Sequence, residues 1–187
     1  NRGYQKDGMI GAKDIDLVQT EKSQIIQKSG LLEMVQLREA MQDIGGLEKL
    51  KPWLEQKSQI FADWPAARDF GVESPKGVMI VGMPGCGKSL TAKATAKLFG
   101  LPLLKMDIGS LMGKYVGESE GNMRRAIAVA EAVSPCVLWV DEVEKAFAGI
   151  GSGAAGSEVA TRLFGYFLTW MQEKTAQVFV VTTANDI

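Results

Sequence analysis

The sequence of 187 residues contains no histidine and only two cysteines, Cys86 and Cys136. Without histidine, this chain can form neither a Ser-His-Asp nor a Cys-His hydrolase site. Histidine-ligated metal sites are excluded for the same reason. The two cysteines are far apart and form no C-x-x-C pair, which excludes a disulfide framework and a cysteine zinc site.

Long apolar runs and an excess of charge of one sign are also absent. No run approaches 18 residues, so we expect no transmembrane helix and no membrane partner. The net charge is −1, which gives no bulk attraction to nucleic acid. The 46% hydrophobic and 23% charged residues match an ordinary globular chain, and the length fits about one domain.

The hydrophobic pattern changes along the chain. Residues 1–13 are rich in glycine and favour a loop, whereas residues 14–29 have helical spacing. A strand at 31–38 and a helix at 47–60 follow, and Pro52 should kink that helix or cost it a hydrogen bond. The later expected elements are strands at 77–81, 102–106, 136–140 and 177–183, helices at 88–99, 119–133 and 158–174, and a glycine-rich loop at 149–157. Alternating strands and helices predict an α/β fold with a parallel sheet covered on both faces.

The segment Gly82-Met83-Pro84-Gly85-Cys86-Gly87-Lys88-Ser89 matches the phosphate-binding pattern G-x-x-x-x-G-K-[ST] between an expected strand and an expected helix. Its glycines let backbone N–H groups approach phosphate oxygens, and the helix N-terminus adds further donors. Lys88 would bind the β- and γ-phosphates, and Ser89 would bind Mg²⁺. A glycine-rich turn with an accidental lysine is the alternative. The expected nucleotide-binding residues here are Pro84, Gly85, Cys86, Gly87, Lys88, Ser89 and Leu90.

A second pattern, Val137-Leu138-Trp139-Val140-Asp141-Glu142, joins four apolar residues to two carboxylates. A buried strand would place Asp141 at its C-terminal end, where open α/β sheets bind ligands. Asp141 would then hold Mg²⁺ beside Ser89, and Glu142 would be the general base. A strand followed by the acidic first turn of a helix is the alternative. Glu144 is expected to be a solvated helix residue.

Together with Thr182-Thr183-Ala184-Asn185 and Asp43-Ile44-Gly45-Gly46-Leu47, these motifs resemble the AAA+ ATPases of the classical AAA branch over about residues 40–187. Within that branch, segments such as Phe167-Leu168-Thr169-Trp170-Met171-Gln172-Glu173-Lys174 are similar to a plastid and cyanobacterial open-reading-frame ATPase family. The resemblance implies a three-layer P-loop NTPase fold, the large subdomain of an AAA+ module.

The resemblance also implies roles that spacing alone does not assign. Asn185 matches the sensor asparagine that positions the attacking water, although Asn185-Asp186 is also a turn signal. Asp43 and Gly45 match positions that contact the adenine base. Lys114, Tyr115 and Val116 match a loop that grips a polypeptide in the pore of a hexamer, although an aromatic packed under a loop is the alternative for Tyr115.

The function implied is Mg²⁺-dependent ATP binding and hydrolysis by a homo-hexameric ring that remodels or threads a protein partner. Catalysis would rest on Lys88, Glu142 and Asn185, with Ser89 and Asp141 holding the metal. A nucleic-acid motor or clamp loader, a nucleotide-switched assembly module with little turnover, and a small-molecule kinase are the alternatives. The expected location is the cytoplasm, or the plastid stroma if the subfamily resemblance holds.

We expect the chain to contain the end of one region followed by part of a second. Residues 1–30 would belong to a preceding region and residues 31–187 to an incomplete large subdomain. The family's fifth strand, arginine finger and helical lid would lie beyond Ile187. An arginine from a neighbouring subunit can accelerate phosphoryl transfer by roughly 10³–10⁵-fold, so this chain alone is expected to hydrolyse ATP weakly.

Overall fold

The computed structural model describes residues 22–38, 40–111, 118–146 and 155–185. Its sheet has the strand order β1-β3-β4-β5-β2. The strands are β1 (Glu33–Val35), β2 (Gly77–Val81), β3 (Leu103–Asp107), β4 (Cys136–Asp141) and β5 (Val178–Ala184). The strands β2, β3, β4 and β5 run parallel to one another, whereas β1 pairs with β3 in the antiparallel direction. The four strands expected after Lys76 are confirmed to within one residue at each end, and the sheet carries an antiparallel edge strand shorter than the expected 31–38.

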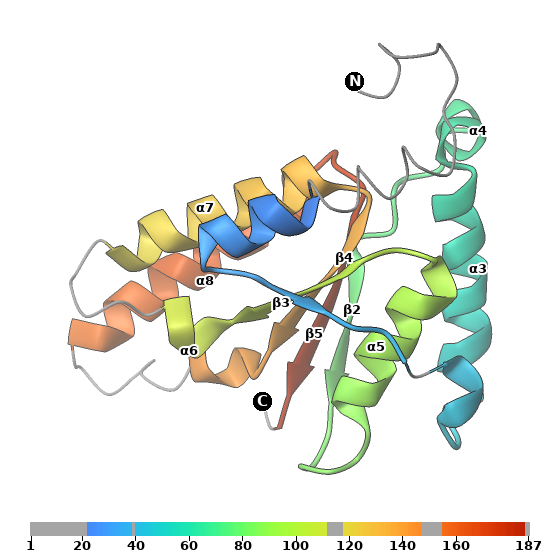
Figure 1. Cartoon of the computed structure of the whole chain (residues 1–187), viewed down its shortest axis with the longest axis horizontal. Coiled ribbons are helices and arrows are strands. Elements are labelled where there is room, and N and C mark those ends of the chain that lie inside the picture. Colours follow the sequence, from blue (N-terminus) through green and yellow to red (C-terminus); the bar gives the residue numbers. More distant parts are fainter. Residues whose placement is uncertain (1–21, 39, 112–117, 147–154, 186–187) are drawn as a thin grey trace.

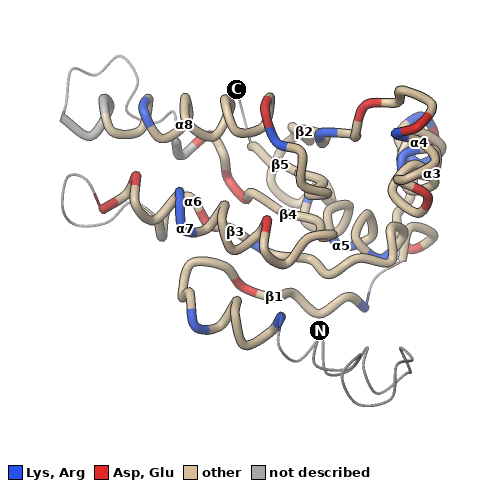
Figure 2. The backbone as a smooth tube through the Cα atoms, turned by 90° about the horizontal axis from the view of Figure 1, so that it is seen from above, with Lys and Arg blue, Asp and Glu red and all other residues tan. Residues whose placement is uncertain are grey.

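Helices cover both faces of this sheet (Figure 1, Figure 2). α3 and α5 lie on one face, and α7 and α8 lie on the other. The helices are α3 (Leu50–Ala62), α4 (Trp64–Asp69), α5 (Lys88–Phe99), α6 (Ile108–Leu111), α7 (Glu118–Val133) and α8 (Ala155–Glu173), with 3₁₀ turns η1 (Met41–Asp43) and η2 (Val143–Ala146). This arrangement confirms the expected three-layer α/β fold.

Three local expectations differ from the structure. α8 begins three residues before the expected 158, so the end of the expected 149–157 loop is helical. The short helix α6 and the two 3₁₀ turns were not expected. The kink or lost hydrogen bond expected at Pro52 is wrong, because Pro52 is the third residue of α3, where N–H groups have no intrahelical partner to lose.

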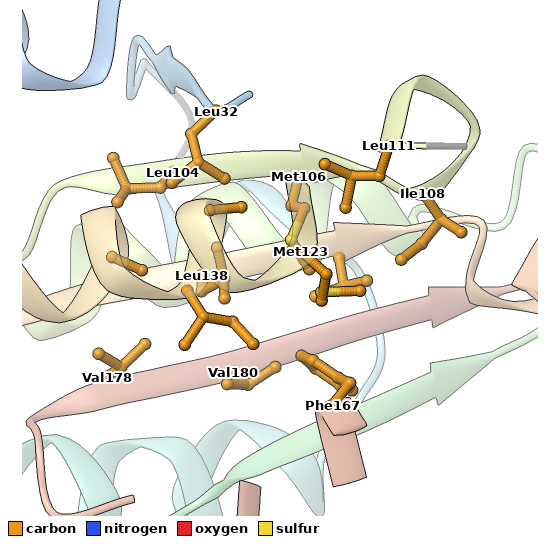
Figure 3. Packing of buried hydrophobic residues seen from close by; sticks show 14 of the residues in the cluster. Leu32, Leu104, Met106, Ile108, Leu111, Met123, Leu138, Phe167, Val178 and Val180 are labelled. Atoms are coloured by element: carbon orange, nitrogen blue, oxygen red, sulfur yellow. The ribbon is translucent and has the colours of Figure 1, made fainter. Parts of the chain in front are cut away.

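The core follows the two-residue period of the strands. Along β4, Cys136, Leu138 and Val140 contribute to the cluster under α7 and α8, shown in part in Figure 3. Val137 and Trp139 contribute to the cluster under α3 and α5. Near-complete burial on both faces explains why β4 reads as a continuous apolar run in the sequence.

The helical residues 22–29 pack on the same core. Ile26 is 1% exposed and belongs to the cluster under α7 and α8, together with Leu32. This segment is therefore packed against the domain that follows it. Within the described ranges, no helix is long and apolar enough to cross a membrane.

Candidate functional site

The phosphate loop joins the end of β2 to the start of α5. Gly85 and Gly87 have φ values of 83° and 89°, a left-handed region that costs other residues about 1–2 kcal/mol. Gly87 is the N-cap residue and makes no side-chain cap hydrogen bond. The N-terminus of a twelve-residue helix therefore opens at this loop without a side-chain cap, which suits an anion.

Two side chains of the loop fold back over it. The Lys88 Nζ donates to the carbonyl oxygens of Gly82 at 2.5 Å and of Met83 at 2.9 Å. The Cys86 Sγ would lie 2.8 Å from a Cβ built at Gly82, so the thiol lies against Gly82 while it remains exposed. Lys88 is thus held at the loop by carbonyl groups, which are weaker partners for an ammonium than phosphate oxygens.

A cavity of about 500 Å³ lies where the loop meets the carboxyl ends of β4 and β5. It is lined by Pro84, Gly85, Gly87, Lys88, Ser89, Leu90, Asp141, Glu142, Thr183, Ala184 and Asn185. Most of the site residues expected from the sequence therefore meet in one place. Cys86 is not in this lining, and Thr183 and Ala184 are additions to the expected site.

The carboxylates of Asp141 and Glu142 both line this cavity because β4 ends between these two residues. Successive residues of a strand face opposite sides of a sheet. Asp141 is the last residue of β4, and Glu142 has a φ of 51°, in the left-handed region that non-glycine residues rarely adopt. Such backbone strain costs of order 1–3 kcal/mol and is concentrated at functional sites.

Asp141 is held by both of its carboxylate oxygens. The Thr183 hydroxyl donates to Oδ1 at 2.7 Å, and the Lys105 Nζ lies 2.9 Å from Oδ2. The Trp139 indole Nε1 donates to the Thr183 hydroxyl oxygen at 3.1 Å. Sequence reasoning missed Lys105 and Thr183 as neighbours of Asp141. The available signal was a single lysine inside an otherwise apolar strand.

The side chain of Asn185 is oriented by Glu144, a residue that was not expected to take part in the site. Its Nδ2 donates to Glu144 Oε1 at 2.7 Å, and Glu144 Oε2 is buried without a protein partner. The expectation that Glu144 is a solvated helix residue is therefore wrong. Because a carboxylate only accepts hydrogen bonds, Glu144 fixes the amide with its nitrogen on this side and leaves Oδ1 available as an acceptor.

The oxygen donors at this pocket fit Mg²⁺. Mg²⁺ commonly takes one or two protein oxygens together with waters and phosphate oxygens. The Ser89 hydroxyl and the Asp141 carboxylate line the same cavity as Lys88. Among the residues whose placement is described, no group of three or more His, Cys, Asp or Glu forms a separate metal cluster.

The remaining expected site residues are not brought to this cavity. Asp43 and Gly45 are exposed and are not in its lining, and Asp43 Oδ2 accepts the backbone N–H of Ala40 at 2.6 Å. Their role at the adenine stays a prediction. The expected pore-loop residues Lys114, Tyr115 and Val116 lie outside the described residues.

A phosphate loop between a strand and a helix, with carboxylates at the carboxyl end of β4, which β5 separates from β2 in the parallel sheet, defines a P-loop nucleotide-binding domain. The chain belongs to the AAA family, described as the ATPase family associated with various cellular activities, which matches residues 78–187.

Curated relatives carry the likeness further. The chain is 47% identical to the uncharacterized AAA domain-containing protein ycf46 of Pyropia yezoensis over 95% of its own length, and 46% identical to that of Guillardia theta over the same share. It spans only 36% and 35% of those proteins. It is also 37% identical to the human ATPase family gene 2 protein homolog A, over 76% of this chain and 16% of that protein. The expected resemblance to the plastid family is thereby confirmed.

Proposed function

We propose that this chain binds ATP in the phosphate-loop cavity and hydrolyses it with the help of Mg²⁺. The observation that carries this proposal is the meeting of Lys88, Glu142 and Asn185 on one cavity of about 500 Å³. A cavity of that volume suits a small-molecule ligand. Membership of a family described as ATPases supports the same activity.

Each residue has a defined part in this proposal. Lys88 and the N-terminus of α5 bind the phosphates, and Ser89 and Asp141 hold the metal. When bound, Mg²⁺ neutralises charge on the phosphate oxygens. Glu142 accepts a proton from the attacking water, which the free Oδ1 of Asn185 helps to orient.

The test compares ATP binding by calorimetry and phosphate release in the parent chain and in Lys88→Ala. We expect Lys88→Ala to weaken ATP binding by about 10²-fold or more, because contacts from one ammonium to two phosphates are lost. Lys97→Ala is the matched control, since Lys97 lies at the other end of α5 and its Nζ donates to the Arg38 carbonyl. Equal ATP affinity in Lys88→Ala and the parent would contradict the proposal.

The same experiment separates the alternative functions. ATP binding without phosphate release would favour a nucleotide-switched assembly module. A salt-sensitive rise in phosphate release on adding DNA or RNA would favour a nucleic-acid motor or clamp loader. A phosphorylated product other than inorganic phosphate would favour a small-molecule kinase.

The proposal extends to a homo-hexameric ring that remodels or threads a protein partner. Resemblance to AAA+ ATPases and the aromatic Tyr115 between two glycines support it. Because the chain spans about a third of the Pyropia and Guillardia relatives, the test is best made on a longer protein that continues past Ile187. A cooperative rise of ATPase rate with protein concentration is expected, and a strictly proportional rate would contradict the ring. The location in the cytoplasm or the plastid stroma stays a prediction.

A further inference from the structure

Four side chains from three neighbouring strands form a connected polar group beside the phosphate loop. Lys105 comes from β3, Trp139 and Asp141 from β4, and Thr183 from β5. The Trp139 indole donates a hydrogen bond to Thr183, and the Thr183 hydroxyl donates one to Asp141. Lys105 forms an ion pair with the other carboxylate oxygen of Asp141. The Lys105 Nζ also lies 4.7 Å from the centroid of the Trp139 ring, within cation–π range.

Strand register explains why these residues meet. Lys105 pairs with Trp139 across β3 and β4, and Trp139 and Asp141 are two residues apart, so they share a sheet face. Trp139 belongs to the cluster under α3 and α5, which places the group on the face that carries the phosphate loop. Lys105 is therefore directed at the metal-binding carboxylate by the sheet itself.

The pair is partly shielded from water. The side chains of Lys105 and Asp141 are 30% and 21% exposed, so their attraction is screened less than that of a surface pair. Asp107 stands next to Asp141 in register and adds negative charge at this end of the sheet. An ammonium here offsets charge that would otherwise attract cations.

We propose that Lys105 is a positioning residue that serves as the resident counter-ion of Asp141. It holds the carboxylate in place without nucleotide and lowers the affinity of the pocket for a free divalent cation. A carboxylate has about four acceptor positions, of which Thr183 and Lys105 occupy two, so Asp141 keeps capacity for water bound to a metal. A metal held by Asp141 would take its remaining ligands from the phosphates of ATP. This inference rests on the proposed function in its assignment of Asp141 to the metal.

The test measures Mn²⁺ binding to the nucleotide-free chain by electron paramagnetic resonance. Lys105→Met removes the charge and keeps an unbranched side chain over Trp139. We expect it to tighten Mn²⁺ binding by about tenfold or more, because a unit charge close to the ligand no longer repels the ion. Lys105→Arg keeps the charge and should bind Mn²⁺ like the parent.

Lys57→Met is the matched control. The Lys57 Nζ also lies over a tryptophan, 5.4 Å from the centroid of the Trp53 ring, but on α3. The Lys57→Met variant should bind Mn²⁺ with an affinity within about twofold of that of the parent. Adding Asp141→Asn to Lys105→Met should abolish the gain. Tighter binding in Lys57→Met, or a gain that survives Asp141→Asn, would place the ion elsewhere and overturn the proposal.

If Lys105→Met does not fold, a single substitution of Asp141 in the parent chain still tests the proposal. Asp141→Asn alone leaves the charge of Lys105 uncompensated, so this variant should bind nucleotide-free Mn²⁺ no more tightly than the parent. Tighter binding in Asp141→Asn would overturn the proposal, as would unchanged affinity in a folded Lys105→Met. Failure of the proposed function looks different, because the parent would then not bind ATP whatever the Mn²⁺ result.

Discussion

The two ends of the sheet each hold a lysine close to the core, and the two lysines have different surroundings. At the carboxyl end, Lys105 is 30% exposed and faces the carboxylate of Asp141. At the amino end, Lys174 is 5% exposed, and its Nζ donates to the Val178 carbonyl at 2.6 Å. Burial, reinforced by nearby Lys76, lowers the pKa of Lys174 from 10.5 to about 8.

The amino end uses its polar groups to complete the fold. The Lys76 Nζ donates to the carbonyls of Gln172 and Lys174 at the end of α8, which lack intrahelical partners. The Trp170 indole donates to Glu131 at 2.7 Å and ties α8 to α7. The carboxyl end instead directs charged groups into a cavity. We infer that changes at the carboxyl end alter ligand chemistry, whereas changes at the amino end alter stability.

The largest expected effect comes from Glu142→Gln at the carboxyl end. The amide cannot act as a general base, so ATP hydrolysis should slow by roughly 10²–10⁴-fold, or about 3–5.5 kcal/mol, while ATP affinity is kept. Phosphate release and calorimetric binding measure the two quantities. Glu173→Gln makes the same change at the exposed end of α8 and should leave the rate unaltered. Hydrolysis at the parent rate would show that Glu142 is not the base.

The two cysteines offer a second contrast between the ends. Cys86 is exposed in the phosphate loop, whereas Cys136 is buried at the start of β4, and its burial raises its pKa from 9.0 to about 12. At pH 8 this difference alone lowers the thiolate fraction of Cys136 about 10³-fold relative to an ordinary thiol. Iodoacetamide should therefore modify one thiol in the folded chain and two after denaturation, as counted by mass spectrometry. Equal rates at both sites in the folded chain would contradict the contrast.

The fold was largely predictable because its signals are local. Each apolar strand from Gly77 onward, and the phosphate loop, is a contiguous pattern that depends on neighbours in sequence. The group around Asp141 was not predictable, because Lys105 and Thr183 lie on different strands and meet only through sheet register. The left-handed backbone of Glu142 also has no sequence signal, since glycine and asparagine are the usual residues there.

The smallest expected effect is a change in the pH dependence of stability at the amino end. Between pH 8 and 10.5, the unfolded chain keeps a proton on Lys174 that the folded chain has released. The free energy of unfolding should therefore rise with pH from about 8, by on the order of 1–3 kcal/mol at most. Cys136 opposes this above about pH 9, because its thiol stays protonated in the folded chain and ionises in the unfolded one.

The window from pH 7.5 to 9 isolates the contribution of Lys174. Urea unfolding there should show stability rising with pH in the parent, and a flatter dependence in Lys174→Met. Lys97→Met removes an exposed lysine from the end of α5 and should keep the slope of the parent. ATP affinity should be unchanged in both variants, because neither lysine lines the cavity. Equal slopes in Lys174→Met and the parent would mean that the buried charge is already compensated, and the contrast between the two ends would then rest on the carboxyl end alone.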